Sequence, residues 1–358
     1  MNTKERFLGV FNYQPVDRVP DLEFGYWEET LQRWQGEGLP ESIQDNWTAE
    51  RYFGFDFYKV GGVNLGIIPS FEKKIIEDKG EHQIIRDTNG TICEVKKEGA
   101  SIPRYIKFPV ETKEDWETFK KRLNPDEPQR YPDNWEELKQ EWKNRDYPLG
   151  INCGSLYGWL RNWMGVENIS LALALQPDWV EEMMEYLTNF VLKVIDRALE
   201  EVDFDCAFWW EDMCFNKGPL ISPAMFRDFM VPRYKRITSR LREKGIELNI
   251  LDCDGNIEKL VPLWLEAGIN VMFPVETAHT NSEKLKDVYG KDLRLLGGVN
   301  KRALIAGPEE IDREMERVKR LLPRGGYIPH VDHRVPPDVS LENYRYYIKR
   351  KREILSSE

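Results

Sequence analysis

Short apolar segments alternate with longer amphipathic segments through most of this chain, and this alternation constrains its fold more than any other feature. From Tyr147 onward, each apolar segment has the length of a β-strand and each amphipathic segment the length of a helix. The predicted strands are 149–153, 206–210, 247–251, 271–273, 293–296 and 327–329, and the predicted helices are 157–163, 179–200, 223–244, 257–267, 283–289 and 309–322. Strands that are apolar throughout are typical of a parallel sheet covered by helices on both faces.

Repeated strand–helix units of this length build either a closed (β/α)₈ barrel or an open doubly wound sheet. The open sheet that binds nucleotides carries Gly-x-Gly-x-x-Gly after its first strand, and this chain has no such motif there. We therefore predict an α/β fold, a (β/α)₈ TIM barrel formed by residues 1–358 as a single domain. Two additions are expected: an N-terminal extension with a helix at 3–11, and a β-hairpin insertion at about 71–100, where a period-two pattern flanks Asn89-Gly90.

Composition excludes several classes of protein. The apolar fraction of 41% predicts a globular chain, while a net charge of -11 with interspersed Lys and Arg disfavours a nucleic-acid or anionic membrane surface. No apolar run approaches the roughly 20 residues of a membrane span, and the polar residues 1–6 are not typical of a signal peptide. The five cysteines are scattered and odd in number, which fits reduced thiols and a cytoplasmic location.

The residues that follow the predicted strands form the candidate site, because these positions face one common mouth in a barrel. Two of the four histidines lie together in the segment 325–337, and a second acidic segment follows the strand 247–251. The expected mouth residues are Cys153, Ser155, Glu211, Asp212, Asp252, Asp254, Glu276, Asn300, Lys301, His330, Asp332 and His333. Carboxylates crowded in this way repel one another unless a cation or a shared proton relieves them.

Each of these carboxylates also has a purely structural explanation. Asp254 precedes a predicted helix and could cap it, and for any single carboxylate capping is about as good an explanation as metal ligation. For Asp252, Asp254 and His333 together, arriving from two different strands, function is the better explanation. Two carboxylates and an imidazole can hold zinc or another divalent ion.

The sequence resembles the uroporphyrinogen decarboxylase superfamily over nearly its whole length. The resemblance is carried by residues 4–8 and 15–20, by 252–257, by Gly297-Gly298-Val299-Asn300-Lys301-Arg302 and by 327–343. It implies a (β/α)₈ barrel and one of two chemistries, which are tetrapyrrole decarboxylation and methyl transfer involving a corrinoid carried on a partner protein.

The methyltransferase branch of the superfamily implies a metal site. In members that methylate coenzyme M, a His-x-Cys pair and a later Cys hold zinc, and the matching positions here are Asp252, Asp254 and His333. Hard carboxylates thus stand where soft thiolates are expected, which favours binding an oxygen group over activating a thiol. The resemblance therefore implies a corrinoid-dependent methyltransferase that takes a methyl group from a small methoxylated donor, with a corrinoid-binding protein as its partner.

Other residues near the predicted mouth are candidates for specific roles. Glu211 is the candidate for a further ligand or general acid, with Glu276 behind it, and His330 and His333 are candidates for catalytic proton transfer. The expected substrate-binding residues are Tyr26, Trp27, Trp209, Trp210 and Asn256. Barrel core is the alternative explanation for several of the aromatic residues, and it is the better one for Trp159 and Trp163, which share a helix face.

Two other functions remain open from the sequence. Decarboxylases of the superfamily meet their octa-anionic substrate with an Arg-rich segment after the first strand, whereas residues 23–30 here are acidic and aromatic. That charge disfavours a tetrapyrrole decarboxylase. A non-catalytic tetrapyrrole or corrinoid binder would need fewer ionisable groups than this mouth contains. The sequence leaves the oligomeric state open, including a homodimer.

Overall fold

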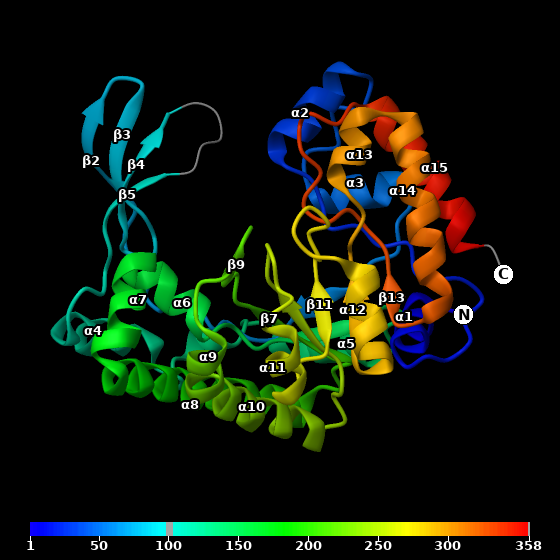
Figure 1. The fold of residues 1–358 in the computed structure, drawn as a ribbon. Helices are drawn as coiled ribbons and strands as arrows, with labels where there is room; N and C mark the ends of the chain where they lie inside the picture. The colour runs from blue at the N-terminus through cyan, green and yellow to red at the C-terminus, as the bar shows by residue number, and fades with distance from the viewer. Residues whose placement is uncertain (98–102, 357–358) are drawn as a thin grey trace.

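The computed structural model describes residues 1–97 and 103–356, and the centre of the described structure is a parallel sheet of seven strands (Figure 1). In spatial order the strands are β1 (Lys59–Gly61), β6 (Leu149–Asn152), β7 (Cys206–Trp210), β10 (Asn249–Asp252), β11 (Val271–Phe273), β12 (Arg294–Leu296) and β13 (Tyr327–Ile328). Every neighbouring pair is parallel, with Leu251 opposite both Trp209 and Met272. The sheet curls in the manner of a TIM barrel, which confirms the predicted class of fold.

The eighth position of the barrel is held by an irregular segment, not by a regular strand. The segment runs from Asp21 to Tyr26. On one side the Asp21 carbonyl accepts a hydrogen bond from the N–H of Asp56, just before β1, at 2.9 Å. On the other side the Gly25 carbonyl accepts one from the N–H of Val335, beyond β13, also at 2.9 Å. The segment therefore bridges the two outer strands without forming a regular ladder.

Helices connect consecutive strands and cover the outer face of the sheet. After the N-terminal helices they follow the strands in chain order, and α8 and α10 pack side by side. The helices are α1 (Thr3–Phe11), α2 (Glu28–Gly36), α3 (Asn46–Phe53), α4 (Lys113–Phe119), α5 (Trp135–Lys143), α6 (Tyr157–Met164), α7 (Val166–Leu175), α8 (Pro177–Glu201), α9 (Pro223–Phe229), α10 (Val231–Glu243), α11 (Val261–Glu266), α12 (Ser282–Tyr289), α13 (Lys301–Ala306), α14 (Pro308–Leu321) and α15 (Leu341–Leu355). Among the described residues, no helix is both long and apolar enough to cross a membrane.

One predicted helix is divided in two. The segment 223–244 was expected to be continuous, but α9 ends at Phe229 and α10 begins at Val231. Pro232 lies in the first turn of α10. A proline lacks the N–H that would continue the preceding helix, and its ring clashes with the carbonyl four residues earlier, so the chain restarts there.

The insertion is a four-stranded antiparallel sheet, larger than the predicted hairpin. Its strands are β2 (Lys74–Lys79), β3 (His82–Arg86), β4 (Ile92–Lys96) and β5 (Arg104–Lys107), in that spatial order. The predicted Asn89-Gly90 turn joins β3 to β4, and Gly90 has the positive φ of 92° that such a turn requires. The part of the predicted insertion from 98 to 100 lies outside the described residues. In Figure 1 this sheet stands at the upper left, away from the barrel.

Helix α1 closes the N-terminal end of the barrel. Phe7 and Phe11 are fully buried and belong to the hydrophobic cluster inside the barrel. The last turn of α1 is tied to the start of two strands, since the Val10 carbonyl accepts from Gly326 N–H at 3.2 Å and the Phe11 carbonyl from Arg294 Nε at 2.9 Å. Burying each Phe contributes about 1.5–3 kcal/mol. The opposite end, where the strands terminate, is the open mouth.

Side chains alternate between the inside of the barrel and the helix layer, as the two-residue period of a strand requires. In β7, Cys206 and Phe208 belong to the interior cluster, whereas Ala207 and Trp209 pack against the helices. In β10, Ile250 faces inward and Leu251 outward. The same alternation turns the last residue of β10, Asp252, toward the inside of the mouth.

Candidate active site

Asp252 places its carboxyl group at the inner rim of the barrel. Its register neighbours are Trp210 on β7 and Phe273 on β11. Within the described part of the chain, no group donates a hydrogen bond to this carboxyl or forms an ion pair with it. Burial raises the pKa of Asp252 well above its usual range, and the charges of Asp254 and Asp212 raise it further. A carboxyl in this setting is readily protonated and free to act on a bound molecule.

Asp254 and His333 meet at the mouth. His333 Nε2 lies 3.6 Å from Asp254 Oδ2. Burial raises the pKa of Asp254 to about 7, with further contributions from the charges of Glu276 and Asp212. Burial also lowers the pKa of His333, and the neighbouring Lys301 ammonium lowers it further. Asp254 therefore exchanges protons near neutral pH, whereas the lowered pKa of His333 favours its neutral imidazole.

Aromatic rings support the imidazole of His333. Trp27 stacks on it with ring centroids 5.7 Å apart and an interplanar angle of 20°. Phe24 approaches its edge, at 5.8 Å and 64°. Trp27 is 39% exposed, so one wall of the site is open to solvent. The irregular segment at the eighth position and the residue that follows it thus supply one ring each to the mouth.

His330 lies beneath this layer and is shielded from solvent. It is 1% exposed, its Nδ1 is 2.7 Å from the Val331 carbonyl, and its ring packs against those of Phe24 and Phe273. Burial lowers the pKa of His330 to about 3. The imidazole is therefore neutral at ordinary pH, and it supports the two phenyl rings.

Glu211 is fully buried behind the mouth. Its carboxylate accepts hydrogen bonds from the N–H groups of Leu156 and Gly158 at 2.8 and 2.9 Å, from Ser155 Oγ at 3.0 Å and from Tyr234 Oη at 2.5 Å. Burial raises its pKa, and these donors oppose the rise. Because four donors occupy the carboxylate, Glu211 anchors the first turn of α6 to the end of β7.

A second acidic cluster is neutralised by one lysine. Lys301 Nζ lies 3.0 Å from Glu276, whose other oxygen accepts a hydrogen bond from Gly255 N–H at 2.9 Å. Burial opposes ionisation of Glu276, but these two donors hold its pKa below the usual range. Asp332 accepts from Thr277 Oγ1 at 2.7 Å and from the Lys301 N–H at 3.0 Å. This network ties together the loops that follow four strands, β10 to β13.

Two of the residues predicted to bind substrate belong to the core. Tyr26 is 2% exposed, and its Oη lies 2.9 Å from that of Tyr344 in a cluster of aromatic rings. Trp209 is also 2% exposed, faces the helix layer and donates its indole N–H to Asn249 at 3.2 Å. The two-residue period explains the second case, because only one of two adjacent tryptophans on a strand can face inward.

Trp210 and Asn256 are the other two predicted residues of this kind, and both lie at the mouth. Trp210 faces inward and is partly buried, with the Arg161 guanidinium 5.3 Å above its ring. Asn256 lies in the turn after β10, where its N–H donates to the Phe215 carbonyl and its side chain accepts from Glu258 N–H. The structure therefore gathers Trp27, Trp210 and Asn256 around the carboxyl groups.

The arrangement of the predicted metal ligands does not match a metal site. Across residues 1–97 and 103–356, no three side chains of His, Cys, Asp or Glu converge closely enough to hold a metal ion. His333 and Asp254 approach each other, but Asp252 does not join them in such a group. The chemistry of this donor set suits a divalent ion, whereas the arrangement of the side chains does not. The three-ligand set remains a prediction, and we derive no chemical step from it.

Two features of the site were not predicted from the sequence. Tyr58, just before β1, stacks on Phe208 inside the barrel with ring centroids 5.1 Å apart. Arg161 on α6 forms an ion pair with Asp212 at 2.9 Å. Inward-facing positions on each strand could have indicated Phe208, but the pairing of Arg161 with Asp212 depends on how α6 lies against β7.

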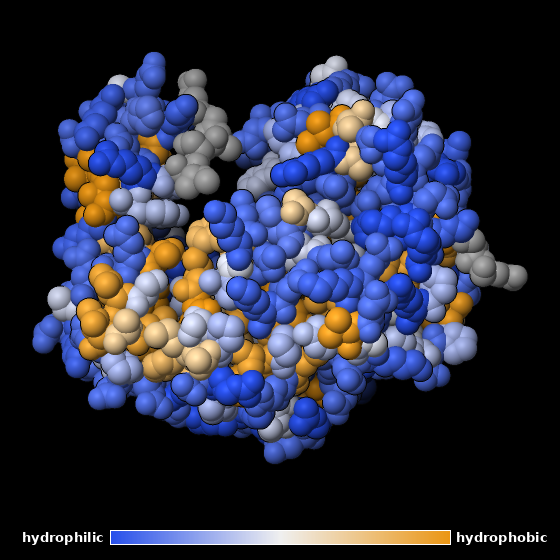
Figure 2. Space-filling view, viewed as in Figure 1, coloured by the Kyte–Doolittle hydropathy of each residue, from blue (hydrophilic) through white to orange (hydrophobic). Residues whose placement is uncertain are grey.

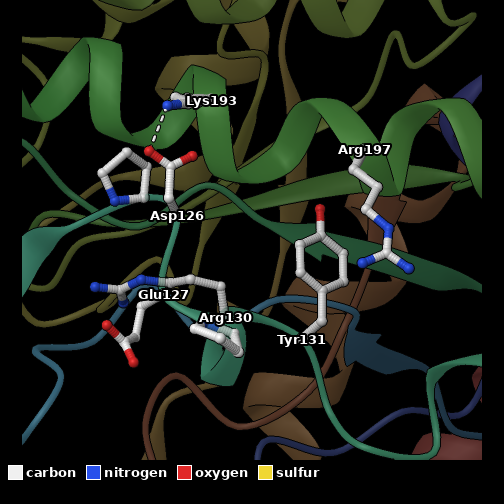
Figure 3. A pocket seen from close by; sticks show the side chains of 8 residues that line it. Asp126, Glu127, Arg130, Tyr131, Lys193 and Arg197 are labelled. Carbon is white, nitrogen blue, oxygen red and sulfur yellow. Dashed lines mark hydrogen bonds and ion pairs between the residues drawn. The ribbon is translucent and has the colours of Figure 1, made fainter.

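A cavity on the outer surface is separate from this site. It has a volume of about 280 Å³ and lies between α8 and the segment that contains Asp126 and Tyr131 (Figure 3). Its lysine, Lys193, is already paired with Asp126 at 2.7 Å. Arg130 is buried and donates to backbone carbonyls, including those of Asn124 and Arg122 at 2.9 and 3.0 Å. These contacts fasten a loop, so the cavity has a structural explanation.

Comparison with known proteins places the chain in a family. The family model for uroporphyrinogen decarboxylase (URO-D) matches residues 90–354. A solved structure described as a methyltransferase from Methanosarcina mazei is similar over 99% of both chains, with a TM-score of 0.66 and 17% identity. A B12-independent methionine synthase from Shewanella sp. W3-18-1, in complex with selenomethionine, covers 94% of this chain and 93% of its own, with a TM-score of 0.45 and 13% identity. No curated protein matches.

Proposed function

Because the chain belongs to the uroporphyrinogen decarboxylase family, we propose that it is the member of a corrinoid-dependent system that removes a methyl group from a small methoxylated donor. The acceptor is a corrinoid carried by a partner protein. The observation that carries the proposal is the free carboxyl group of Asp252, which lies at the inner rim of the mouth between two aromatic neighbours. The structural likeness to a protein described as a methyltransferase supports the proposal at the level of fold.

Methyl transfer from an ether oxygen makes one demand on the enzyme. The bond between carbon and oxygen breaks, the bonding electrons stay on the oxygen, and that oxygen must be stabilised or protonated. A reduced corrinoid, when bound, supplies the nucleophile that accepts the methyl group. Asp252 supplies the proton, because its raised pKa keeps a fraction of it in the acid form, although the charge of Arg334 partly opposes that rise.

In this proposal, Asp254 and His333 support proton donation by the Asp252 carboxyl group. Asp254 is 35% exposed and has a pKa of about 7, so it can take up a proton from solvent and return it to Asp252 after each turnover. His333 holds Asp254 in place and stacks on Trp27, which keeps one wall of the mouth ordered. The proposal uses no metal ion at any step.

Glu211 and His330 were predicted to act directly on the substrate, and we propose positioning roles for both. Four donors already occupy the Glu211 carboxylate. His330 is 1% exposed, and its lowered pKa leaves it without a proton to give at neutral pH. Both residues hold the mouth in shape without contacting the reacting atoms.

The charges of the mouth argue against tetrapyrrole decarboxylation. The charge of Asp212 raises the pKa values of Asp252 and Asp254, and the charge of Asp254 raises that of Asp252 further. Of the nearby cations, Lys301 and Arg161 are already paired with Glu276 and Asp212, and Arg334 lies over the ring of Trp27. A substrate with many carboxylates would meet an acidic surface in which most of the nearby positive charges are occupied.

The proposal is tested by a methyl transfer assay on the purified chain. Reduced cobalamin, with and without a corrinoid-binding protein, is mixed with a panel of methoxylated donors, and formation of the methylated corrinoid is followed by its absorbance spectrum. The account predicts enzyme-dependent methylation with at least one methoxylated donor. Decarboxylation of a uroporphyrinogen without any methyl transfer would contradict it.

A further inference from the structure

A cavity of about 670 Å³ lies beside the barrel mouth, between the insertion sheet and the α6–α7 junction. In Figure 1 this sheet stands directly above α6 and α7, and Figure 2 shows an open notch between it and the block of terminal helices. The hairpin of β8 (Cys214–Phe215) and β9 (Gly218–Pro219) contributes the remaining wall. Cavities of this volume are the size of small-molecule sites.

Aromatic rings from separate elements line this cavity. Tyr105 of β5 and Phe108 lie with ring centroids 5.6 Å apart, and Phe215 comes from β8. Tyr105 and Phe215 are 55% and 57% exposed. A single exposed aromatic residue needs no explanation, but rings from distant segments facing one cavity provide a surface on which another ring can stack.

The charges around the cavity select against an anionic occupant. Asp87, Glu167 and Asp212 line it, and the cation among its lining residues is Arg161. That guanidinium is paired with Asp212 at 2.9 Å and lies over Trp210. Glu167 also lies in the first turn of α7, where its charge offsets the positive end of the helix dipole. No cation of the lining is free for a carboxylate or phosphate, so an uncharged aromatic compound fits best.

Asp212 connects this cavity to the mouth. Its side chain lines the cavity, and its backbone N–H donates to the Asp252 carbonyl at 3.4 Å. It also has a positive φ of 41°, which is unusual for a residue other than glycine and turns the chain sharply after β7. Asp212, Arg161 and Trp210 therefore form the partition between the cavity and the inside of the barrel.

From this geometry we propose that the cavity binds the ring of an uncharged methoxylated aromatic donor, and that the methoxy group passes the partition toward Asp252. The insertion sheet is then the element that selects the substrate. This inference rests on the proposed function for the reaction at the methoxy group, whereas binding of the ring in the cavity does not depend on it.

The test uses 2-methoxyphenol as the probe and isothermal titration calorimetry on the full chain. Val166 lines the cavity and is 37% exposed, so Val166→Trp fills it with a larger side chain. Leu175 lies on the same helix, is 73% exposed and does not line the cavity, which makes Leu175→Trp the matched control. Equal thermal unfolding temperatures of the two variants exclude a general folding defect.

We expect Val166→Trp to weaken binding of 2-methoxyphenol by about tenfold or more and Leu175→Trp to leave it unchanged. We also expect 2-methoxybenzoate to bind more weakly than 2-methoxyphenol. Wild-type affinity in Val166→Trp, tighter binding of the benzoate, or no binding of 2-methoxyphenol to the wild type would each overturn the inference.

If the wild type binds the ring in the cavity but methylates no corrinoid, the proposed function fails and the cavity assignment stands. If Val166→Trp transfers methyl groups with an unchanged KM, the cavity assignment fails and the function stands.

Discussion

His333 Nε2 lies 3.6 Å from Asp254 Oδ2, which joins the loop after the last strand of the barrel to the loop after β10. Trp27 stacks on the same imidazole, so the N-terminal segment takes part in this contact. One side chain therefore links three parts of the chain that are far apart in sequence. Asp252, two residues before Asp254, lies next to this link and faces the inside of the barrel.

Replacing His333 tests whether the contact with Asp254 matters for turnover. His333→Phe keeps a ring that can stack on Trp27 but cannot pair with Asp254, and His333→Ala removes both interactions. We expect both variants to lose about 100-fold or more in kcat with the fold intact, because Asp254 is no longer held where it can return the proton to Asp252. Methyl transfer and circular dichroism measure the two effects. A wild-type rate in His333→Phe would show that only stacking is needed.

Replacing Glu211 tests its assignment as a buried anchor. Glu211→Ala leaves four buried donors, among them Ser155 Oγ and Tyr234 Oη, without an acceptor. We expect the free energy of unfolding to fall by about 3 kcal/mol, as measured by urea denaturation. Glu182→Ala, at an exposed position on α8, is the control and should change stability little. A change in kcat without a loss of stability would show instead that Glu211 takes part in catalysis.

The pH dependence of stability tests the burial of His330. Its pKa is about 3 in the folded chain against an ordinary value of 6.5, so between these values the unfolded chain binds a proton that the folded chain does not. Its contribution to stability is therefore complete above pH 6.5 and is lost as the pH falls toward 3, by up to about 1.4 kcal/mol per pH unit.

The measurement compares the free energies of unfolding of the wild type and His330→Gln between about pH 7 and pH 4. We expect the wild-type value to fall more steeply with acid than that of the variant. A constant difference between the two proteins across this range would show that His330 is not buried in the neutral form.

Much of the barrel could be predicted from the sequence because its strands are short, apolar and regularly spaced. The segments that became β7, β10 and β11 were expected within a few residues of their observed bounds. The eighth position could not be predicted, since the segment from Asp21 to Tyr26 is held by contacts to both neighbouring edges and has no ladder of its own. The number of strands in the sheet from Lys74 to Lys107 was underestimated, because only its central turn carries a strong Asn-Gly signal.

The candidate site was predictable only in part, for a geometric reason. The positions of Asp254 and His333 just after two predicted strands indicated that the two side chains would lie near each other. Spacing alone could not decide that Trp209 faces outward and Trp210 inward, because this depends on the register of β7. Nor could it indicate that Tyr26 is core, since that follows from its contact with Tyr344 on α15.

The measurement that tests the central claim most directly is the rate of methyl transfer by Asp252→Asn, with Asp338→Asn, an exposed carboxyl on the loop after β13, as the control. The account predicts that Asp252→Asn retains its fold but loses about 100-fold or more in kcat with a methoxyphenol donor, while Asp338→Asn is unchanged. It also predicts a smaller loss with a nitro-substituted methoxyarene, whose phenolate needs less help to leave. A wild-type rate in Asp252→Asn, or an equal loss with both donors, would contradict the claim that this carboxyl group protonates the leaving oxygen.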